Sequence, residues 1–286
     1  MSERILVTGA GVTGSEVARQ LSATGRQTRA LVRSPERAEP VRKLGVQVIE
    51  GDFANRESWK RALDGVAAVF NITVPHPDTV AWNAVFIECA KQSGVKHVVQ
   101  LSGMTVSPSS PAGFHRQMSQ CDEALKASGL SCTILQPNVF HQNILRMAAP
   151  IRAHGRFRLA AGDAHISMID VRDVAEVAVK SLTEGGHTNR VYVLTGPETV
   201  TYFDVARSLS EALGKLIVYE ALTENEAARE LIDSGVPEPV ARSRVGVHRS
   251  LATGAFAEVT GDVQRLLQRA PRSFAEFARD YASEFR

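Results

Sequence analysis

Three glycines near the N-terminus have the spacing of a phosphate-binding turn. Gly9, Gly11 and Gly14 follow a short apolar run and lead into a segment with helical spacing. In a strand, turn and helix unit, the first glycine makes the tight turn, the second lets a pyrophosphate approach the backbone, and the third lets helix and strand pack closely. Free N–H groups at the helix start, where Val12 and Thr13 lie, would bind the phosphates. The alternative is a glycine-rich turn without a ligand.

Arg33 ends the next apolar segment, 28–32, where dinucleotide-binding folds recognise the ribose. An acidic residue at this place binds a 2′-hydroxyl, whereas an arginine offers a planar fork of donors to a 2′-phosphate. The sequence therefore favours NADP(H), with NAD(H) left open because Arg33 also suits an ordinary surface position. Further on, we expect Asp52 to accept a hydrogen bond from the adenine amino group and Phe53 to pack near its ring. Alternatively, Asp52 caps a helix around 57–63.

The elements that position these residues alternate regularly through the first half of the chain. Strands are expected at 5–7, 28–32, 46–49, 67–72, 96–102 and 132–135, with helices between them. This alternation predicts an α/β fold, a Rossmann doubly wound parallel sheet whose ligand crosses the carboxyl ends of the strands. Beyond the residues named above, the cofactor-binding residues expected at those ends are Ile72, Thr73, Val74, Ser102, Pro137, Asn138 and Val139.

The pattern changes near residue 140. Short strands are expected at 157–159, 165–168 and 191–194, helices at 170–183, 202–213, 224–234 and 239–245, irregular structure at 247–260, and an amphipathic segment at 273–285. We interpret residues 1–140 as the nucleotide-binding core. Residues 141–286 form a smaller α/β substrate-binding region, layered on the main sheet and packed on the core as one structural unit.

Composition excludes several classes of function. The 286 residues carry a net charge of +2, which gives no basic field for nucleic acid or a membrane surface. No apolar stretch approaches the roughly 18 residues of a spanning helix, and the chain enters its first strand without a leader, so we expect a cytoplasmic protein. The three cysteines lack metal-ligand spacing, and no metal site is predicted. A homodimer is left open.

With these motifs in place, the chain resembles the NmrA-like branch of the atypical short-chain dehydrogenase/reductases, especially its NADPH-dependent quinone oxidoreductases. The resemblance covers nearly the whole length. Its carriers are Val7 to Ala10 with Gly14, Ala30 to Ser34, Gly51-Asp52, Gly94 to Val99, Ser128 to Leu130 with Thr133 to Asn138, and Ile169 to Ala175. The resemblance implies a Rossmann fold, NADP(H) in the cleft, and nicotinamide near the exits of the fourth to sixth strands.

The same resemblance implies that this chain lacks two side chains on which catalytic short-chain dehydrogenases depend. Catalytic short-chain dehydrogenases use a tyrosine that donates a proton and a lysine that lowers its pKa, and these positions fall on Phe114 and Met118. Neither side chain can transfer a proton. Ser102 matches the family's serine and could hydrogen-bond a substrate oxygen, or close a turn at the strand end. The candidates for the substrate wall are Pro75, His76, Met104, Phe114, Met118, Val139, Phe140 and Phe157. Several of the apolar ones could equally be core residues, and the histidine could be a solvated loop residue.

Two functional hypotheses follow. The first is an NADPH-dependent reductase that transfers hydride to a small quinone-like aromatic substrate, because such a substrate needs no strong acid. A narrower version places it in aromatic polyketide tailoring, in antibiotic biosynthesis, where the reduced quinone is hydroxylated by O2 in a net monooxygenation. The second is a non-catalytic redox sensor that binds NADP(H) and contacts a partner protein. We favour the enzyme because the C-terminal region is retained and no nucleic-acid element is evident.

Overall fold

The computed structural model describes residues 4–110 and 112–286. The chain divides into two compact units, one made of the residues up to 137 together with 171–194, and the other of 138–170 and 195–286. The chain leaves the first unit close to the expected boundary at residue 140. However, residues 171–194, which were expected in the C-terminal region, return to the first unit. The reason is that they supply a helix and a strand to its sheet.

The first unit contains a seven-stranded sheet in the order β3-β2-β1-β4-β5-β6-β8, and neighbouring strands run parallel. This is the Rossmann arrangement predicted from the sequence, because the strand order reverses between β1 and β4. The strands are β1 (Arg4–Thr8), β2 (Thr28–Val32), β3 (Gln47–Glu50), β4 (Val66–Ile72), β5 (His97–Leu101), β6 (Cys132–Pro137) and β8 (Arg190–Leu194).

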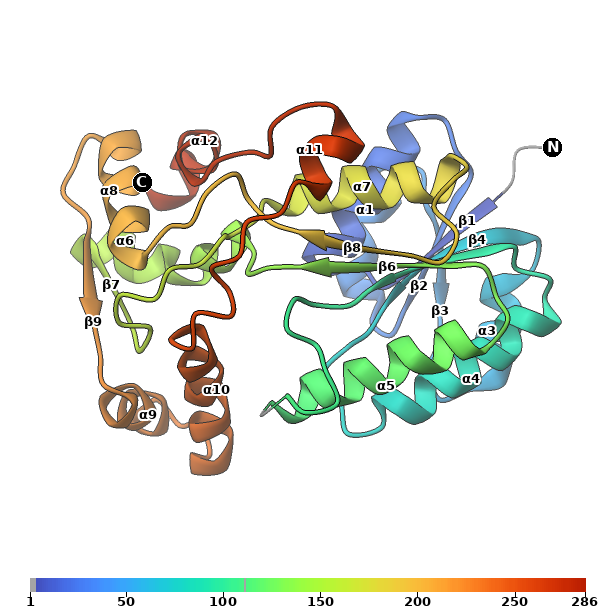
Figure 1. Ribbon diagram of the computed structural model, residues 1–286, viewed down its shortest axis with the longest axis horizontal. Coiled ribbons are helices and arrows are strands. Elements are labelled where there is room, and N and C mark those ends of the chain that lie inside the picture. The colour runs from blue at the N-terminus through green and yellow to red at the C-terminus, as the bar shows by residue number, and fades with distance from the viewer. Residues whose placement is uncertain (1–3, 111) are drawn as a thin grey trace. The chain divides into compact units, whose positions relative to one another are not determined.

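Helices cover both faces of this sheet (Figure 1). On one face α1 (Val12–Ala23) packs against α7 (Val171–Thr183), and on the other α4 (Thr79–Gln92) lies between α3 (Arg56–Leu63) and α5 (Gly113–Ala127). Two short helices, η1 (Pro35–Ala38) and α2 (Glu39–Arg42), follow β2. The central strands are largely apolar and buried on both faces, as expected for a covered parallel sheet, and the buried polar exceptions on β1, β4 and β5 are Thr8, Asn71 and Gln100.

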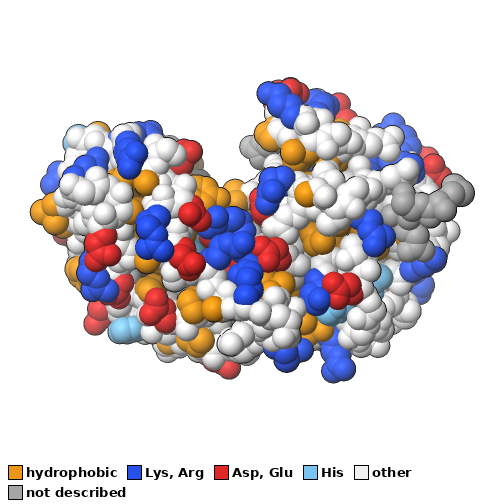
Figure 2. Space-filling model, turned by 90° about the horizontal axis from the view of Figure 1, so that it is seen from above, with side chains coloured by type: hydrophobic (Ala, Val, Ile, Leu, Met, Phe, Trp, Pro, Cys, Tyr) orange, Lys and Arg blue, Asp and Glu red, His pale blue; other side chains and the backbone are white. Residues whose placement is uncertain are grey.

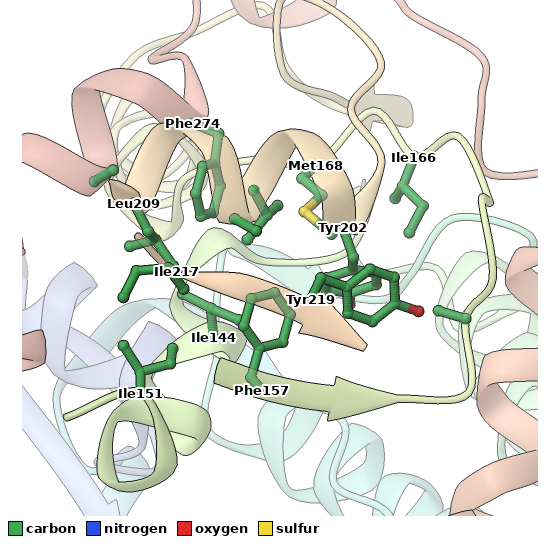
Figure 3. Close-up of a cluster of buried hydrophobic side chains, with 14 of the residues drawn as sticks. Ile144, Ile151, Phe157, Ile166, Met168, Tyr202, Leu209, Ile217, Tyr219 and Phe274 are labelled. Atoms are coloured by element: carbon green, nitrogen blue, oxygen red, sulfur yellow. The ribbon is translucent and has the colours of Figure 1, made fainter. Parts of the chain in front are cut away.

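The second unit has its own core around aromatic side chains, shown in Figure 3. Its two parallel strands are β7 (Arg156–Leu159) and β9 (Val218–Ala221). Its helices are η2 (His141–Met147), α6 (Ala148–His154), α8 (Tyr202–Leu213), α9 (Glu224–Asp233), α10 (Glu238–Leu251), α11 (Asp262–Leu267), α12 (Phe274–Asp280) and η3 (Ala282–Phe285). Capping boxes begin α8, α9 and α12, where Thr or Ser pairs with an acidic residue three positions later.

Several expectations for this half of the chain are corrected. The strand expected at 165–168 is a single bridge between Ile166 and Val200. The segment 191–194 is not layered on the sheet but is its seventh strand, hydrogen-bonded to β6. Helix α10 continues to Leu251, into the stretch expected to be irregular, and β9 and the helices at 141–154 were not predicted.

Candidate functional site

The glycine turn has the geometry that a pyrophosphate requires. Gly9 has φ +117°, and a Cβ added at Gly14 would collide with the Gly9 carbonyl oxygen, so both positions require glycine. At Gly11, an added Cβ meets no heavy atom within 4 Å among the described residues. Gly11 is the N-cap of α1, and no described side chain caps that end by hydrogen bonding. Exposed Val12 and buried Thr13 begin the helix, whose first N–H groups are therefore available to a phosphate.

Arg33 lies against an aromatic wall beyond the end of β2. Its guanidinium carbon is 5.6 Å from the ring centroid of Phe53 and 5.8 Å from that of Trp82. The His76 ring stacks on the same indole at 4.0 Å, and its Nδ1 accepts the backbone N–H of Asp78. Cation–π attraction thus holds Arg33 where a 2′-phosphate is expected. His76 therefore lies on the same indole as Arg33, and its contact with the substrate stays a prediction.

Asp52 does not cap α3, which was one of its two expected roles. Its Oδ1 accepts the backbone N–H of Ala54, while Asn55 caps the helix by accepting from the backbone N–H groups of Glu57 and Ser58. Asp52 is exposed, so its second carboxylate oxygen is accessible to a ligand. Contact of Asp52 with adenine stays a prediction.

A small hollow lies at the carboxyl ends of β1 and β4 in the first unit. Its walls include Thr8, Phe53, Ile72, Thr73, Val74 and Trp82. Thr73 Oγ1 is buried and has no hydrogen-bond partner among the described residues. A hydroxyl left in this state beside the glycine turn fits a ligand that supplies the missing hydrogen bond. Together with the open backbone at Gly11, it makes the ends of β1 and β4 compatible with a dinucleotide.

A chain of buried polar side chains crosses the sheet to Ser102. Thr8 Oγ1 donates to Asn71 Oδ1 (3.3 Å), and Asn71 Nδ2 donates to Gln100 Oε1 (3.0 Å). Gln100 Nε2 then donates to Asp122 Oδ1, and Ser102 Oγ donates to Asp122 Oδ2. Each of these two hydrogen bonds is 2.6 Å long. Ser102 is 5 % exposed and Asp122 3 %. Burial raises the pKa of Asp122, although the hydrogen bonds from Ser102 and Gln100 oppose this.

Helix α5 carries this acid on the same face as the missing proton-transfer pair. Phe114, Met118 and Asp122 are spaced by four residues, so they follow one another along one side of the helix. Met118 is buried, and its Cε lies 3.8 Å from the position of a Cβ added at Gly103, just beyond β5. Met118 thus lies at the exit of β5, which Ser102 directly follows, and Phe114 is one turn earlier on the same side of the helix. Asp122 was missed by the sequence analysis, and its i+4 relation to Met118 was the available signal.

The loop after β5 holds strain close to these residues. Thr105 has φ +63°, which is unusual for a β-branched residue. Its Oγ1 lies 3.4 Å from Nδ1 of His115, the neighbour of Phe114 on α5. Met104 is tied to β6 by the hydrogen bond from its N–H to the Pro137 carbonyl (2.9 Å). The backbone at this strand exit is therefore held in a specific conformation.

The remaining expected residues divide between the units. Exposed Pro75 follows β4 in the first unit, whereas Asn138, Val139, Phe140 and Phe157 belong to the second. The Asn138 amide donates to Ser167 Oγ and to the Phe256 carbonyl, which uses both of its hydrogens. Asn138 therefore has no side-chain proton to donate to a cofactor.

Phe157 is corrected from a substrate residue to a core residue. It is 1 % exposed, stacks on Tyr219 at 5.3 Å and meets Tyr202 edge-on, as Figure 3 shows. The half-buried Phe140 bridges to Ile169 and keeps its expected role only as a prediction.

The described residues give little support for other classes of site. They contain no group of three His, Cys, Asp or Glu side chains that could hold a metal ion. Within the same ranges, no helix is long and apolar enough to cross a membrane. On the face shown in Figure 2, basic and acidic side chains are interspersed.

Comparison with known proteins identifies relatives along the full chain. The chain is 36% identical to an NAD(P)H azoreductase of Xenophilus azovorans over 98% of both chains. It is 38% identical to a (4-alkanoyl-5-oxo-2,5-dihydrofuran-3-yl)methyl phosphate reductase of Streptomyces griseus, over 98% of this chain and 99% of that one. The structure of the Escherichia coli NADPH-dependent quinone oxidoreductase QOR2 with NADPH is similar at a TM-score of 0.83, with 26% identity, covering 96% of this chain and 98% of the other. The NmrA-like family model matches residues 1–278, and the chain belongs to this family.

Proposed function

We propose that the chain is an NADPH-dependent reductase that adds hydride to a quinone-like aromatic acceptor without a tyrosine and lysine acid pair. It is an NAD(P)H-dependent oxidoreductase, and its cofactor is NADP(H). The acceptor class rests on one observation, the apolar pair Phe114 and Met118 on the α5 face at the exit of β5.

Different residues of the chain bind different parts of the cofactor. The start of α1 binds the pyrophosphate through backbone N–H groups, with Gly11 permitting close approach. Arg33, steadied by Phe53 and Trp82, pairs with the 2′-phosphate. When bound, NADPH supplies the hydride. The protein therefore has to place an acceptor near the nicotinamide and exclude water from it.

The basicity of the product decides which acceptors can do without an acid. Hydride addition to a ketone leaves an alkoxide, whose conjugate acid is about as weak as water and so roughly 5 to 6 pKa units weaker than a phenol. Addition to a quinone leaves a phenolate, with a tyrosine-like pKa of ~10. At about 1.36 kcal/mol per pKa unit, the difference is roughly 8 kcal/mol of basicity that the protein does not have to manage. Side chains such as Phe114 and Met118 therefore suit a quinone and not a ketone.

The relatives support acceptors of this kind. Their names describe an azo compound, an unsaturated lactone and a quinone, all of which are conjugated and accept hydride without first forming an alkoxide. The proposed apolar contacts to such a ring in the first unit are Pro75, Met104, Phe114 and Met118, because flat rings bind between apolar walls.

Anaerobic oxidation of NADPH, followed at the nicotinamide absorbance, tests this function. The acceptors are benzoquinones, naphthoquinones and anthraquinones, with simple ketones as the comparison. Turnover of quinones but not ketones is the expected result. Equal turnover of ketones would refute the acid-free argument, and tight NADPH binding without turnover of any acceptor would favour the redox sensor.

A finer proposal concerns oxygen. A hydroquinone formed at the site can react with O2, so that one oxygen atom enters the ring and the other leaves as water, giving a hydroxyquinone. The hydroquinone itself supplies the electrons, and the net reaction is a monooxygenation of the kind used in aromatic polyketide tailoring. Repeating the assay in air with a polycyclic quinone should give O2 uptake and a hydroxylated product. NADPH oxidation without either would rule this version out.

A further inference from the structure

We propose that Asp122 and Ser102 form a proton relay, in which Asp122 supplies the proton and Ser102 passes it to the oxyanion of the reduced substrate. This proposal rests on the proposed function, because that function produces an oxyanion. Asp122 is a positioning and proton-storing residue, whereas Ser102 is the group that would touch the substrate. The relay takes over part of the role of the missing tyrosine.

The geometry joins these two groups directly. The Ser102 hydroxyl and Asp122 Oδ2 are 2.6 Å apart, and both side chains are almost completely buried. Ser102 directly follows β5, at the edge where ligands of this fold bind. Asp122 lies behind it on α5, so its route to a substrate oxygen passes through the Ser102 hydroxyl.

The neighbouring amides fix which way Asp122 is hydrogen-bonded. Asn71 Nδ2 donates both to Asn83 Oδ1 and to Gln100 Oε1, and the Gln100 amide therefore presents its NH2 group to Asp122. Oδ1 of Asp122 is thus always an acceptor. Any proton on this carboxyl has to reside on Oδ2, the oxygen that faces Ser102.

The protonation state of Asp122 consequently sets the role of Ser102. When Asp122 is ionised, the Ser102 hydrogen is donated to Oδ2, and Ser102 can only accept from a ligand. When Asp122 is protonated, Oδ2–H donates to Ser102 Oγ, and the Ser102 hydrogen is free to point at a substrate oxygen.

The transfer balances with these atoms alone. As negative charge forms on the substrate oxygen, Ser102 Oγ–H gives its proton to that oxygen, and Asp122 Oδ2–H gives its proton to Ser102 Oγ. The products are a neutral hydroquinone hydroxyl, an unchanged serine and an Asp122 carboxylate. Water then returns one proton to the carboxylate before the next turnover.

The surroundings of Asp122 favour its storing a proton. Lys126 and Glu123, on α5, act on it in opposite directions, and burial has the largest effect on its pKa, which is raised. The other titratable groups coupled to it are thiols, Cys121 on α5 and Cys132 on β6. Burial raises the pKa of Cys121 to about 12 and also raises that of Cys132, so both stay neutral near pH 7. Among the described residues, the hydrogen-bond network that reaches Asp122 from β4, α4 and the end of β5 consists of neutral amides and the Ser102 hydroxyl.

The variant Asp122→Asn separates proton storage from structure. Its Oδ1 can still accept from Gln100 and its Nδ2 can donate to Ser102, so the hydrogen bonds persist while the transferable proton is lost. We would measure kcat/KM for a series of quinones whose hydroquinones differ in pKa. The ratio of wild type to variant should be near 1 for the least basic product and rise to about 100-fold for the most basic, as expected for loss of a general acid.

Matched variants distinguish this result from a structural defect. Ser102→Ala should give the same rising ratio, and the double variant should be no worse than either single one, because the two groups act as a unit. Ser119→Ala, which removes another buried hydroxyl from α5, should leave the ratio at 1 for every quinone. A ratio that is constant along the series in Asp122→Asn would show a structural role and overturn the relay.

A second readout is independent of turnover. Infrared difference spectra between low and neutral pH should contain a protonated carboxyl C=O band that is lost in Asp122→Asn. Its titration midpoint should match the pH above which the wild type loses its advantage on basic acceptors. If the band is absent throughout, the relay is wrong even where quinones are reduced. If the wild type reduces no quinone, the proposed function fails and the relay fails with it.

Discussion

Alanine substitutions at Gly11 and Gly14 should separate cofactor binding from folding. At Gly11, φ is −78° and an added Cβ meets no described atom within 4 Å, so the fold accepts the methyl group. That methyl group would stand where a pyrophosphate approaches the start of α1. Loss of one charge-assisted hydrogen bond costs about 2 kcal/mol, which weakens NADPH binding roughly 30-fold. The unfolding free energy should change by less than about 1 kcal/mol, as is usual for the exchange of glycine for alanine at an N-cap.

At Gly14, by contrast, an added methyl group should destabilise the fold. Its Cβ collides with the backbone carbonyl of Gly9 and comes within 3.0 Å of Ile72 Cδ1. Overpacking of this kind costs about 1–3 kcal/mol, and the better helix propensity of alanine returns up to about 1 kcal/mol. We therefore expect Gly14→Ala to lose about 1–2 kcal/mol of unfolding free energy.

Denaturant unfolding and NADPH titration, followed by protein fluorescence, measure the two effects on each variant. An unchanged NADPH affinity in Gly11→Ala would mean that the phosphates bind elsewhere. Wild-type stability in Gly14→Ala would refute the close packing of α1 on the turn.

Three further predictions follow from the same structure. Arg33→Ala should weaken NADPH binding about 10- to 100-fold and leave NADH binding nearly unchanged, since a charged pair to phosphate is worth about 1.5–3 kcal/mol; equal losses in the two titrations would make Arg33 an ordinary surface residue. Because the pKa of Asp122 is raised on folding, the stability that it contributes is present at low pH and lost as pH rises through the folded pKa. Unfolding at several pH values should therefore show wild type losing stability relative to Asp122→Asn as pH increases, and a constant difference would contradict the raised pKa. Phe157→Ala should cost about 3–5 kcal/mol while the KM for a quinone stays the same; a raised KM at unchanged stability would return this residue to the substrate wall.

The first unit could be predicted from sequence because its signals are local. Each strand is a short apolar run, each helix has its own periodicity, and the glycine turn joins two such elements. The return of 171–194 had no local signal, since β8 becomes a sheet strand by pairing with β6. Similarly, β9 pairs with β7 about sixty residues earlier. Gly246 lowered the apparent helix propensity of the segment where α10 continues.

The residues of the candidate site show the same distinction between local and long-range signals. The turn glycines and Arg33 are identified by residue type and spacing, because backbone freedom and a guanidinium are properties of single residues. The stacking of Arg33 on Trp82 and the burial of Asp122 depend on how α4 and α5 lie over the sheet. In the sequence, Asp122 stands next to Glu123, and two adjacent acidic residues in a helix suggest a solvated face. The burial of Asp122 is explained by its hydrogen-bond donors, Gln100 on β5 and Ser102 just after it.

The loss of the lysine position and the burial of Asp122 are physically linked. Met118 precedes Asp122 by four residues, the spacing at which a lysine and a carboxylate on one helix pair. A lysine at that position would hold Asp122 ionised and direct the Ser102 hydrogen permanently toward it. The buried methionine instead leaves the carboxyl in a more apolar setting, and burial raises its pKa. Asp122 also lies four residues, about 6 Å along the helix axis, beyond the lysine position. An acid at that depth needs the Ser102 hydroxyl to reach a substrate oxygen, so the apolar pair and the relay are two parts of one arrangement.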